Sequence, residues 1–207
     1  MLGGGVALLA SATLGWLWLA KAPTPRPEIV PLPIPLTGGP ELTEAEISGL
    51  AWVGDSLVLL PQYPASFGGS VFVIDRAEIE RVLSAPDGDP ISARRVPLDA
   101  PALEQELPGF DGFEAIAVDG DDVFVTVETR RGSGASSGYV LAGRVQGDLE
   151  RIVIDPTRRA ELLPQNDLVN TSYEALVVHG DRVLAIYETN GEVNPSPRVL
   201  VFDRFFK

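Results

Sequence analysis

The sequence predicts an all-β fold: a β-propeller of four-stranded antiparallel blades, with about three blades present. The first observation behind this prediction is a unit that occurs three times and aligns without gaps, as Ile47–Gln62, Phe113–Glu128 and Tyr173–Glu188. Each copy holds an apolar strand, a Gly-Asp turn and a second apolar strand, and the copies start 66 and then 60 residues apart. A repeat with this spacing is typical of propeller blades. The second observation is composition, since 21 Gly and 18 Pro are typical of a turn-rich, β-rich domain.

Within each copy, a tight turn separates two strands. Gly54, Gly120 and Gly180 each precede an Asp at this turn and supply the positive φ that a hairpin needs. The first strand has about seven residues, as in 114–119. The second strands are predicted at Ser56–Leu60, Val123–Val127 and Val183–Tyr187.

Further strands complete the blades. Third strands are predicted at Ser70–Asp75, Gly138–Ala142 and Arg198–Asp203, and fourth strands at Ala93–Leu98 and Leu149–Ile154. Two other segments, Arg76–Leu83 and Pro156–Leu163, are expected to be short helical or irregular insertions.

The domain organisation follows from these strands. Residues 41–207 form a partial β-propeller with blades at about 44–100, 110–155 and 170–207. Three blades do not close a ring, because propellers usually have four to eight. The sequence therefore predicts part of a six-bladed ring, either as an incomplete ring or as a half-ring that pairs with another. Open blade edges would then favour self-association.

The amino end has the character of a targeting segment. Leu2–Leu19 is apolar or small and uncharged, and Ala20-Lys21-Ala22 places small residues where signal peptidase cleaves. We interpret residues 1–22 as a signal peptide or an uncleaved membrane anchor. Residues 23–40 form a Pro-rich linker whose distal part could add an edge strand. The expected location is extracytoplasmic (periplasmic, secreted or membrane-anchored), with membrane contact only through this segment.

Charge and composition restrict the chemistry. The net charge of −13 disfavours nucleic acid as a partner and suits divalent cations, although acidity can also serve solubility alone. The absence of Cys excludes disulfides, thiolate nucleophiles and Cys-based metal sites. A single histidine, His179, excludes a histidine-cluster zinc site within one chain and is expected to be an exposed turn residue. Trp52 is expected to pack in the core or between blades.

Two acidic pairs align in the repeats. Glu114 and Glu128 in the second unit, and Glu174 and Glu188 in the third, flank a hairpin that brings each pair to the same rim. The first unit has the uncharged pair Ser48 and Gln62 at these positions.

The pairs suggest a metal site. The first strand of a blade lines the central channel, so Glu114 and Glu174 are expected near the axis, with Glu128 and Glu188 behind them. Four neighbouring carboxylates repel one another unless a cation neutralises them. Ca²⁺ prefers oxygen ligands and is the expected cation. Asp111 and Asn170 could add ligands. The structural alternative is that each Glu caps backbone amides or pairs with an arginine: Arg130, Arg131 or Arg198.

The motifs resemble those of a known family. They are Ile47-Ser-Gly-Leu-Ala51, Gly112-Phe-Glu-Ala-Ile-Ala-Val118 with Glu128, and Ser172-Tyr-Glu-Ala-Leu-Val-Val178 with Glu188. This pattern resembles the phytase-like domain called "esterase-like activity of phytase", and more loosely the β-propeller phytases and the SdiA-regulated family. The resemblance implies a propeller, calcium bound by carboxylates at the channel mouth, and a phosphoester or ester substrate. The first unit departs from it, because Gln62 stands where members often carry an acidic residue.

The sequence leaves two functions open. One is an exported, calcium-dependent hydrolase of phosphoester or ester bonds, with Glu114, Glu174 and Arg130 as catalytic candidates. Arg130 could hold a substrate phosphate, or it could simply face solvent. The other function is a non-catalytic propeller, or a fragment of one, that binds a small molecule, a phosphorylated ligand or a protein.

Overall fold

The computed structural model describes residues 44–85, 88–101, 103–130 and 136–206, together with 31, 33, 36, 37 and 132. The chain divides into two compact units, Met1–Leu32 and Pro33–Lys207, and the second contains every strand reported below. The predicted signal peptide or anchor at residues 1–22, and most of the linker at 23–40, lie outside the described residues. No helix of the described part of the chain is both long and apolar enough to cross a membrane.

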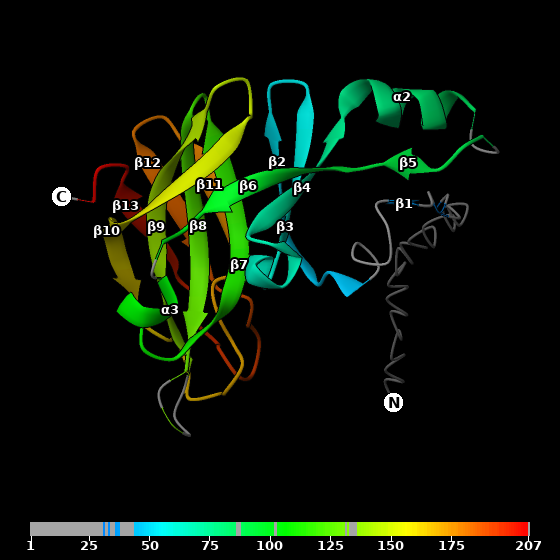
Figure 1. The fold of residues 1–207 in the computed structure, drawn as a ribbon. Helices are drawn as coiled ribbons and strands as arrows, with labels where there is room; N and C mark the ends of the chain where they lie inside the picture. Colours follow the sequence, from blue (N-terminus) through cyan, green and yellow to red (C-terminus); the bar gives the residue numbers. More distant parts are fainter. Residues whose placement is uncertain are drawn as a thin grey trace, which may run out of the picture. The chain divides into compact units, whose positions relative to one another are not determined.

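Apart from the short strands β1 and β5, the described strands form three blades (Figure 1). The first blade contains β2 (Ile47–Val53), β3 (Ser56–Pro61), β4 (Ser70–Asp75) and β6 (Arg94–Asp99). The second contains β7 (Phe110–Asp119), β8 (Asp122–Thr129), β9 (Ser137–Gln146) and β10 (Arg151–Leu162). The third contains β11 (Ala175–His179), β12 (Arg182–Ile186) and β13 (Val199–Asp203). Neighbouring strands within each blade are antiparallel, which confirms the prediction of an all-β fold of antiparallel blades.

The first two blades are joined at both edges. Strands β6 and β10 pair in parallel through Leu98 and Ile152, which makes one eight-stranded sheet. The sheet bends back on itself, so its end strands β2 and β7 also lie side by side. A glycine permits this approach, because a Cβ atom on Gly49 would lie 3.0 Å from the backbone nitrogen of Ile116.

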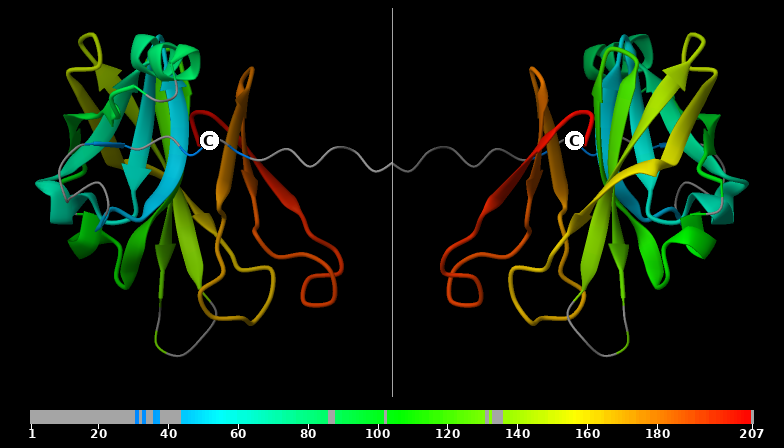
Figure 2. Two further views of the ribbon diagram at one scale, coloured as in Figure 1. Left: turned by 90° about the vertical axis from the view of Figure 1, so that its right-hand side faces the viewer. Right: turned by 90° about the vertical axis from the view of Figure 1, so that its left-hand side faces the viewer.

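The core lies between successive blades, which stand in chain order in Figure 2. Val58 and Leu60 of the first blade and Val125 and Leu141 of the second are all fully buried in one cluster. A second cluster lies between the second and third blades and includes Phe124, Val140, Val183 and Ala185. Burial of these apolar faces drives the blades together.

A short helix covers the other face of the first blade. This helix, α2 (Arg76–Ser84), packs with η1 (Pro64–Phe67) and β5 (Ile91–Ser92) over Leu59, Phe72 and Ile74. It matches the predicted insertion at Arg76–Leu83. The remaining short elements are β1 (Leu36–Thr37), which pairs in parallel with β5, and α3 (Leu103–Glu106).

Two expectations about local structure are wrong. Segment Pro156–Leu163 is not an insertion along its whole length, because residues 159–162 continue β10 along β9; only residues 156–158 stand unpaired, in the bulge between Asp155 and Arg159. Proline has no N–H to donate, and the bulge accommodates it without breaking the strand. Trp52 is 44% exposed rather than in the core, and the guanidinium of Arg76 lies 4.3 Å from the centroid of its ring.

The predicted turns are confirmed. Gly54, Gly120 and Gly180 have φ values of 54°, 61° and 58°, which L-residues seldom adopt. His179, the last residue of β11, is exposed as expected.

Candidate functional site

A repeated β-bulge positions the first carboxylate. The register between β7 and β8 shifts between Phe113 and Ala115, which leaves Glu114 without a partner in the ladder. The register between β2 and β3 shifts around Ser48, the equivalent residue of the first blade. A bulge bends the strand and redirects a side chain, and here the Glu114 side chain is buried, with the residue only 5% exposed.

Three of the four predicted metal ligands meet. One carboxylate oxygen from each of Glu114, Glu128 and Glu174 lies within 4.8 Å of the other two. Glu128 is near the end of β8, and Glu174 directly precedes β11, so the group joins the second and third blades. Glu114 and Glu128 are buried, and Glu174 is exposed, which leaves one side of the group open to solvent.

Crowding and burial favour the protonated forms of two of these acids, Glu114 and Glu174. Burial, followed by repulsion from Glu174 and Glu128, raises the pKa of Glu114 to about 8. Partial burial, followed by repulsion from Glu188 and Glu128, raises the pKa of Glu174 to about 7. Glu114 and Glu174 therefore bind protons near neutral pH, and a cation could replace these protons.

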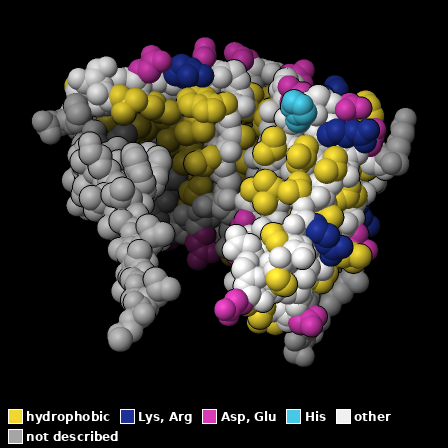
Figure 3. Space-filling model, turned by 180° about the vertical axis from the view of Figure 1, so that it is seen from behind, with side chains coloured by type: hydrophobic (Ala, Val, Ile, Leu, Met, Phe, Trp, Pro, Cys, Tyr) yellow, Lys and Arg dark blue, Asp and Glu magenta, His cyan; other side chains and the backbone are white. Residues whose placement is uncertain are grey.

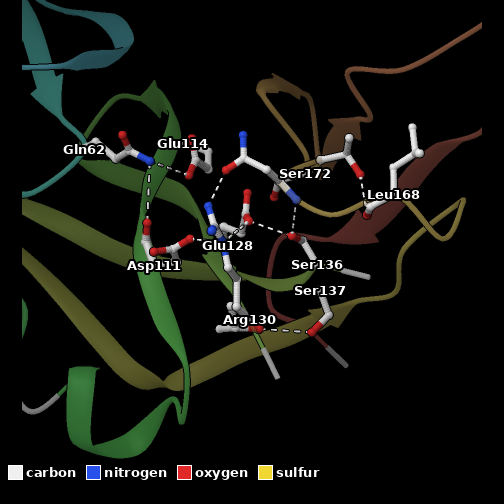
Figure 4. Close-up of polar contacts among 12 residues, drawn as sticks. Gln62, Asp111, Glu114, Glu128, Arg130, Ser136, Ser137, Leu168 and Ser172 are labelled. Carbon is white, nitrogen blue, oxygen red and sulfur yellow. Dashed lines mark hydrogen bonds and ion pairs between the residues drawn. The ribbon is translucent and has the colours of Figure 1, made fainter. Parts of the chain in front are cut away.

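The first blade contributes a hydrogen-bond donor to this group. Nε2 of Gln62 donates to Oε1 of Glu114 at 3.2 Å and to the backbone oxygen of Asp111 at 3.5 Å (Figure 4). The backbone of Gln62 is also fixed, because its carbonyl accepts the N–H of Phe113 at 2.9 Å. Gln62 thus orients Glu114 without adding another negative charge.

Glu128 is held by a hydroxyl group from a loop. Oγ of Ser136 donates to Oε1 of Glu128 at 2.7 Å, and Ser136 itself is 1% exposed (Figure 4). The same oxygen of Ser136 accepts the backbone N–H of Asn170 at 2.9 Å. The Ser136 hydroxyl therefore fixes the position of the Glu128 side chain.

Arg130 is engaged by three neighbours. Its guanidinium forms an ion pair with Asp111, approaches Oε1 of Glu128 at 3.4 Å and donates to the side-chain oxygen of Asn170. These contacts agree with the structural alternative in which arginine neutralises the acids. They compete with the predicted use of Arg130 as a phosphate ligand, and Arg131 lies outside the described residues.

Glu188 lies outside the group of three. Its Oε1 atom accepts the backbone N–H of Ser172 at 2.8 Å, which is the capping role expected as an alternative. Oγ of Ser172 is buried and has no hydrogen-bond partner among the described residues. This oxygen and the carboxylates are the kind of ligands that hard cations prefer.

Sequence reasoning did not assign roles to Gln62 and Ser136. The alignment of the repeats carried a signal for Gln62, because it occupies the position of Glu128 and Glu188. Ser136 carried no signal, since it lies in a Gly- and Ser-rich loop that joins two strands.

An open groove reaches the exposed side of the site. It has a volume of about 320 Å³ and lies among the first strands of the three blades, which are β2, β7 and β11. Glu174 lines it together with Leu50, Ile116 and Leu176. A groove of this size, largely apolar with one carboxylate, can take a small molecule.

Comparisons with known proteins give no family for this chain. No family model matches the sequence, and no curated protein matches it. Among solved structures, a mutant GH32 beta-fructofuranosidase of Bombyx mori (BmSUC1) in complex with sucrose matches with a TM-score of 0.38 and 14% identity. That match covers 76% of this chain and 33% of the enzyme, so the chain spans about a third of its length. The computationally designed Ika4 protein matches with a TM-score of 0.30 and 11% identity, over 81% of this chain and 96% of the other.

Proposed function

We propose that this chain is a metal-binding β-propeller of the phytase-like kind, in which Glu114, Glu128 and Glu174 hold a divalent cation. The observation that carries the proposal is the approach of three carboxylate oxygens to within 4.8 Å of one another. Ca²⁺ fits this donor set because it takes six to eight oxygen ligands in flexible geometry. When bound, the ion would supply positive charge that neutralises the acids and attracts an anionic ligand.

The test is calcium binding to the full chain in detergent solution, measured by titration calorimetry. We expect binding at neutral pH that the double variant Glu114→Gln/Glu174→Gln loses. A matched control, Glu80→Gln, removes an exposed carboxylate on α2 and should bind as the wild type does. If folded wild-type protein binds no calcium at millimolar concentration, calcium is excluded as the ligand. Protons shared among the carboxyls would then account for their close approach.

Proton release gives a second readout. With pKa values of about 8 and about 7, Glu114 is mostly protonated and Glu174 is partly protonated at pH 7, and a cation would displace these protons. The measured heat of binding should therefore depend on the ionisation enthalpy of the buffer. Equal heats in all buffers would contradict the assignment of these two acids as ligands.

A second candidate function is hydrolysis of phosphoester or ester bonds. The raised pKa of Glu114 favours it, because a carboxyl that is neutral at pH 7 can donate a proton to a leaving oxygen. The groove beside Glu174 gives room for a small ester. We expect activity on aryl phosphates or aryl esters that falls at least about a hundredfold in Glu114→Gln. An active Glu114→Gln variant would remove the acid role.

The proposal includes export from the cytoplasm, supported by the uncharged apolar segment Leu2–Leu19. Fractionation of cells that express the full chain tests this part. Recovery in the cytoplasmic fraction would overturn it.

A further inference from the structure

We propose that a second copy of this chain docks on the outer face of its third blade. We define this face as the side of β11, β12 and β13 that points away from the second blade. It carries Ala175, Val177, Leu184, Ile186, Val199 and Val201. Figure 3 shows hydrophobic side chains gathered on this side of the sheet, beside the cyan histidine.

Strand alternation makes the face apolar. Val177 pairs with Leu184, which pairs with Val201, and Ile186 pairs with Val199, so these side chains stand on the same side of the sheet. Val177, Ile186, Val199 and Val201 are 47%, 40%, 49% and 57% exposed. The opposite side of the same strands holds Val183 and Ala185, which are fully buried against the second blade.

The repeat shows what such a face ordinarily does. In the ungapped alignment, Leu184 and Ile186 are equivalent to Phe124 and Thr126 in the second blade, and to Val58 and Leu60 in the first. Phe124 and Thr126 are 1% and 0% exposed, and Phe124 packs on the third blade. Val58 and Leu60 are each 0% exposed and pack on the second blade. The outer face of the third blade thus continues a series of two intramolecular interfaces between sheets.

The outer face of the first blade limits how a second copy can dock. The face of the first blade that points away from the second is already covered by α2 and η1, over Phe72 and Ile74. Head-to-tail docking there would displace the helix. The third blade's outer face has no such cover among the described residues, so two copies can join these faces about a two-fold axis. Arg182 and Asp203 lie at one end of the face and carry opposite charges. This end of the face therefore does not present charges of one sign that would repel a second copy.

The size of the face sets the strength of the interface. Three strands of five residues, about 4.8 Å apart with about 3.3 Å per residue, cover roughly 240 Å² in projection. Standard stable interfaces bury about 800 Å² per partner. We therefore expect a reversible dimer with micromolar or weaker affinity, which covalent trapping detects better than chromatography.

Disulfide trapping tests this proposal directly, because the chain has no native cysteine. Three single-cysteine variants of the full chain are made: Val177→Cys, Val199→Cys and Val201→Cys. The rate of disulfide-linked dimer formation is then measured in detergent under mild oxidation. Leu83→Cys on α2 is the matched control, since Leu83 is 60% exposed and lies away from this face. In a specific pair, facing thiols meet at an effective concentration in the millimolar range.

We expect at least one of the three face variants to cross-link about tenfold faster than Leu83→Cys. Adding Ile186→Lys to the fastest variant should return its rate to that of the control, while circular dichroism shows an intact fold. Equal rates at all positions would mean random collision within micelles and would overturn the proposal. The proposal would also be overturned if all three face variants stayed monomeric under oxidation while Leu83→Cys cross-linked at its usual rate.

Discussion

Gln62 and Glu114 are joined across the first two blades by a hydrogen bond of 3.2 Å from Nε2 to Oε1. Gln62 occupies the position that Glu128 and Glu188 occupy in the other repeats. A glutamate at this position would add a further carboxylate to the group, whereas the amide donates a hydrogen bond to Glu114. The departure of the first unit from the acidic pattern therefore gives the buried Glu114 carboxyl a hydrogen-bond donor when no cation is bound.

Gln62→Glu tests this relationship. The change replaces a donor by a carboxylate beside Glu114, so we expect the free energy of unfolding without metal to fall by about 1–3 kcal/mol. Saturating calcium should restore most of the loss, because an added carboxylate is a ligand for the cation. Urea unfolding with and without calcium measures both effects. Gln105→Glu, the same change at an exposed position on α3, should shift stability by less than about 0.5 kcal/mol.

The stability of the metal-free chain should fall as pH rises. The pKa of Glu114 is about 8 in the folded chain against an ordinary value of 4.5, so the folded state binds more protons between these limits. The contribution is complete below about pH 4.5 and is lost as pH rises through about 8. Urea unfolding in the presence of a chelator, at steps from pH 5 to pH 9, measures the slope.

Glu114→Gln is the variant that isolates this effect. It has no titrating group at position 114 and should show a much shallower slope, while Glu80→Gln keeps the wild-type profile. Parallel profiles for wild type and Glu114→Gln would mean that another group controls the pH dependence. Each pKa unit of difference corresponds to about 1.4 kcal/mol, so even part of the shift is measurable.

The fold was largely predictable because its signals are local and repeated. Alternating apolar strands and the glycines at 54, 120 and 180 predicted the three hairpins. The extension of β10 through Pro156 was not predictable from local signals, since proline usually ends a strand. Pairing of Arg159 and Leu162 with β9 outweighs that local preference.

The acidic residues of the candidate site were predictable, but the residues that hydrogen-bond to them were not. The aligned positions of Glu114, Glu128 and Glu174 identified the residues that the structure brings together. Glu188 is not one of the three, and its carboxylate accepts the backbone N–H of Ser172. Contacts made by loops, such as that of Ser136 with Glu128, depend on the path that the loop takes in space. The sequence pattern does not predict that path.

Ser136→Ala should destabilise the chain by about 1–3 kcal/mol. The change leaves the buried Glu128 carboxylate without its 2.7 Å hydrogen bond, and it leaves the partly buried N–H of Asn170 without an acceptor. Thermal unfolding measures the loss. Ser84→Ala is the control, because Ser84 is exposed and donates only to the carbonyl of Glu80 on α2. Equal effects of the two changes would show that the contact with Glu128 contributes little.

Gly112→Ala should disturb the carboxylate group itself. Gly112 has φ of 120°, and a Cβ atom there would lie 2.5 Å from Cγ of Gln62. Gln62 would have to move and give up its hydrogen bond to Glu114, so backbone strain and the lost contact should together cost about 3 kcal/mol. Gly120→Ala is the matched control, because Gly120 also has positive φ but has no atoms within 4 Å of the added Cβ. We expect it to cost only about 1 kcal/mol, from backbone conformation alone, and to leave calcium binding unchanged. If Gly112→Ala is no worse than Gly120→Ala and binds calcium equally well, then Gln62 is not needed to position Glu114.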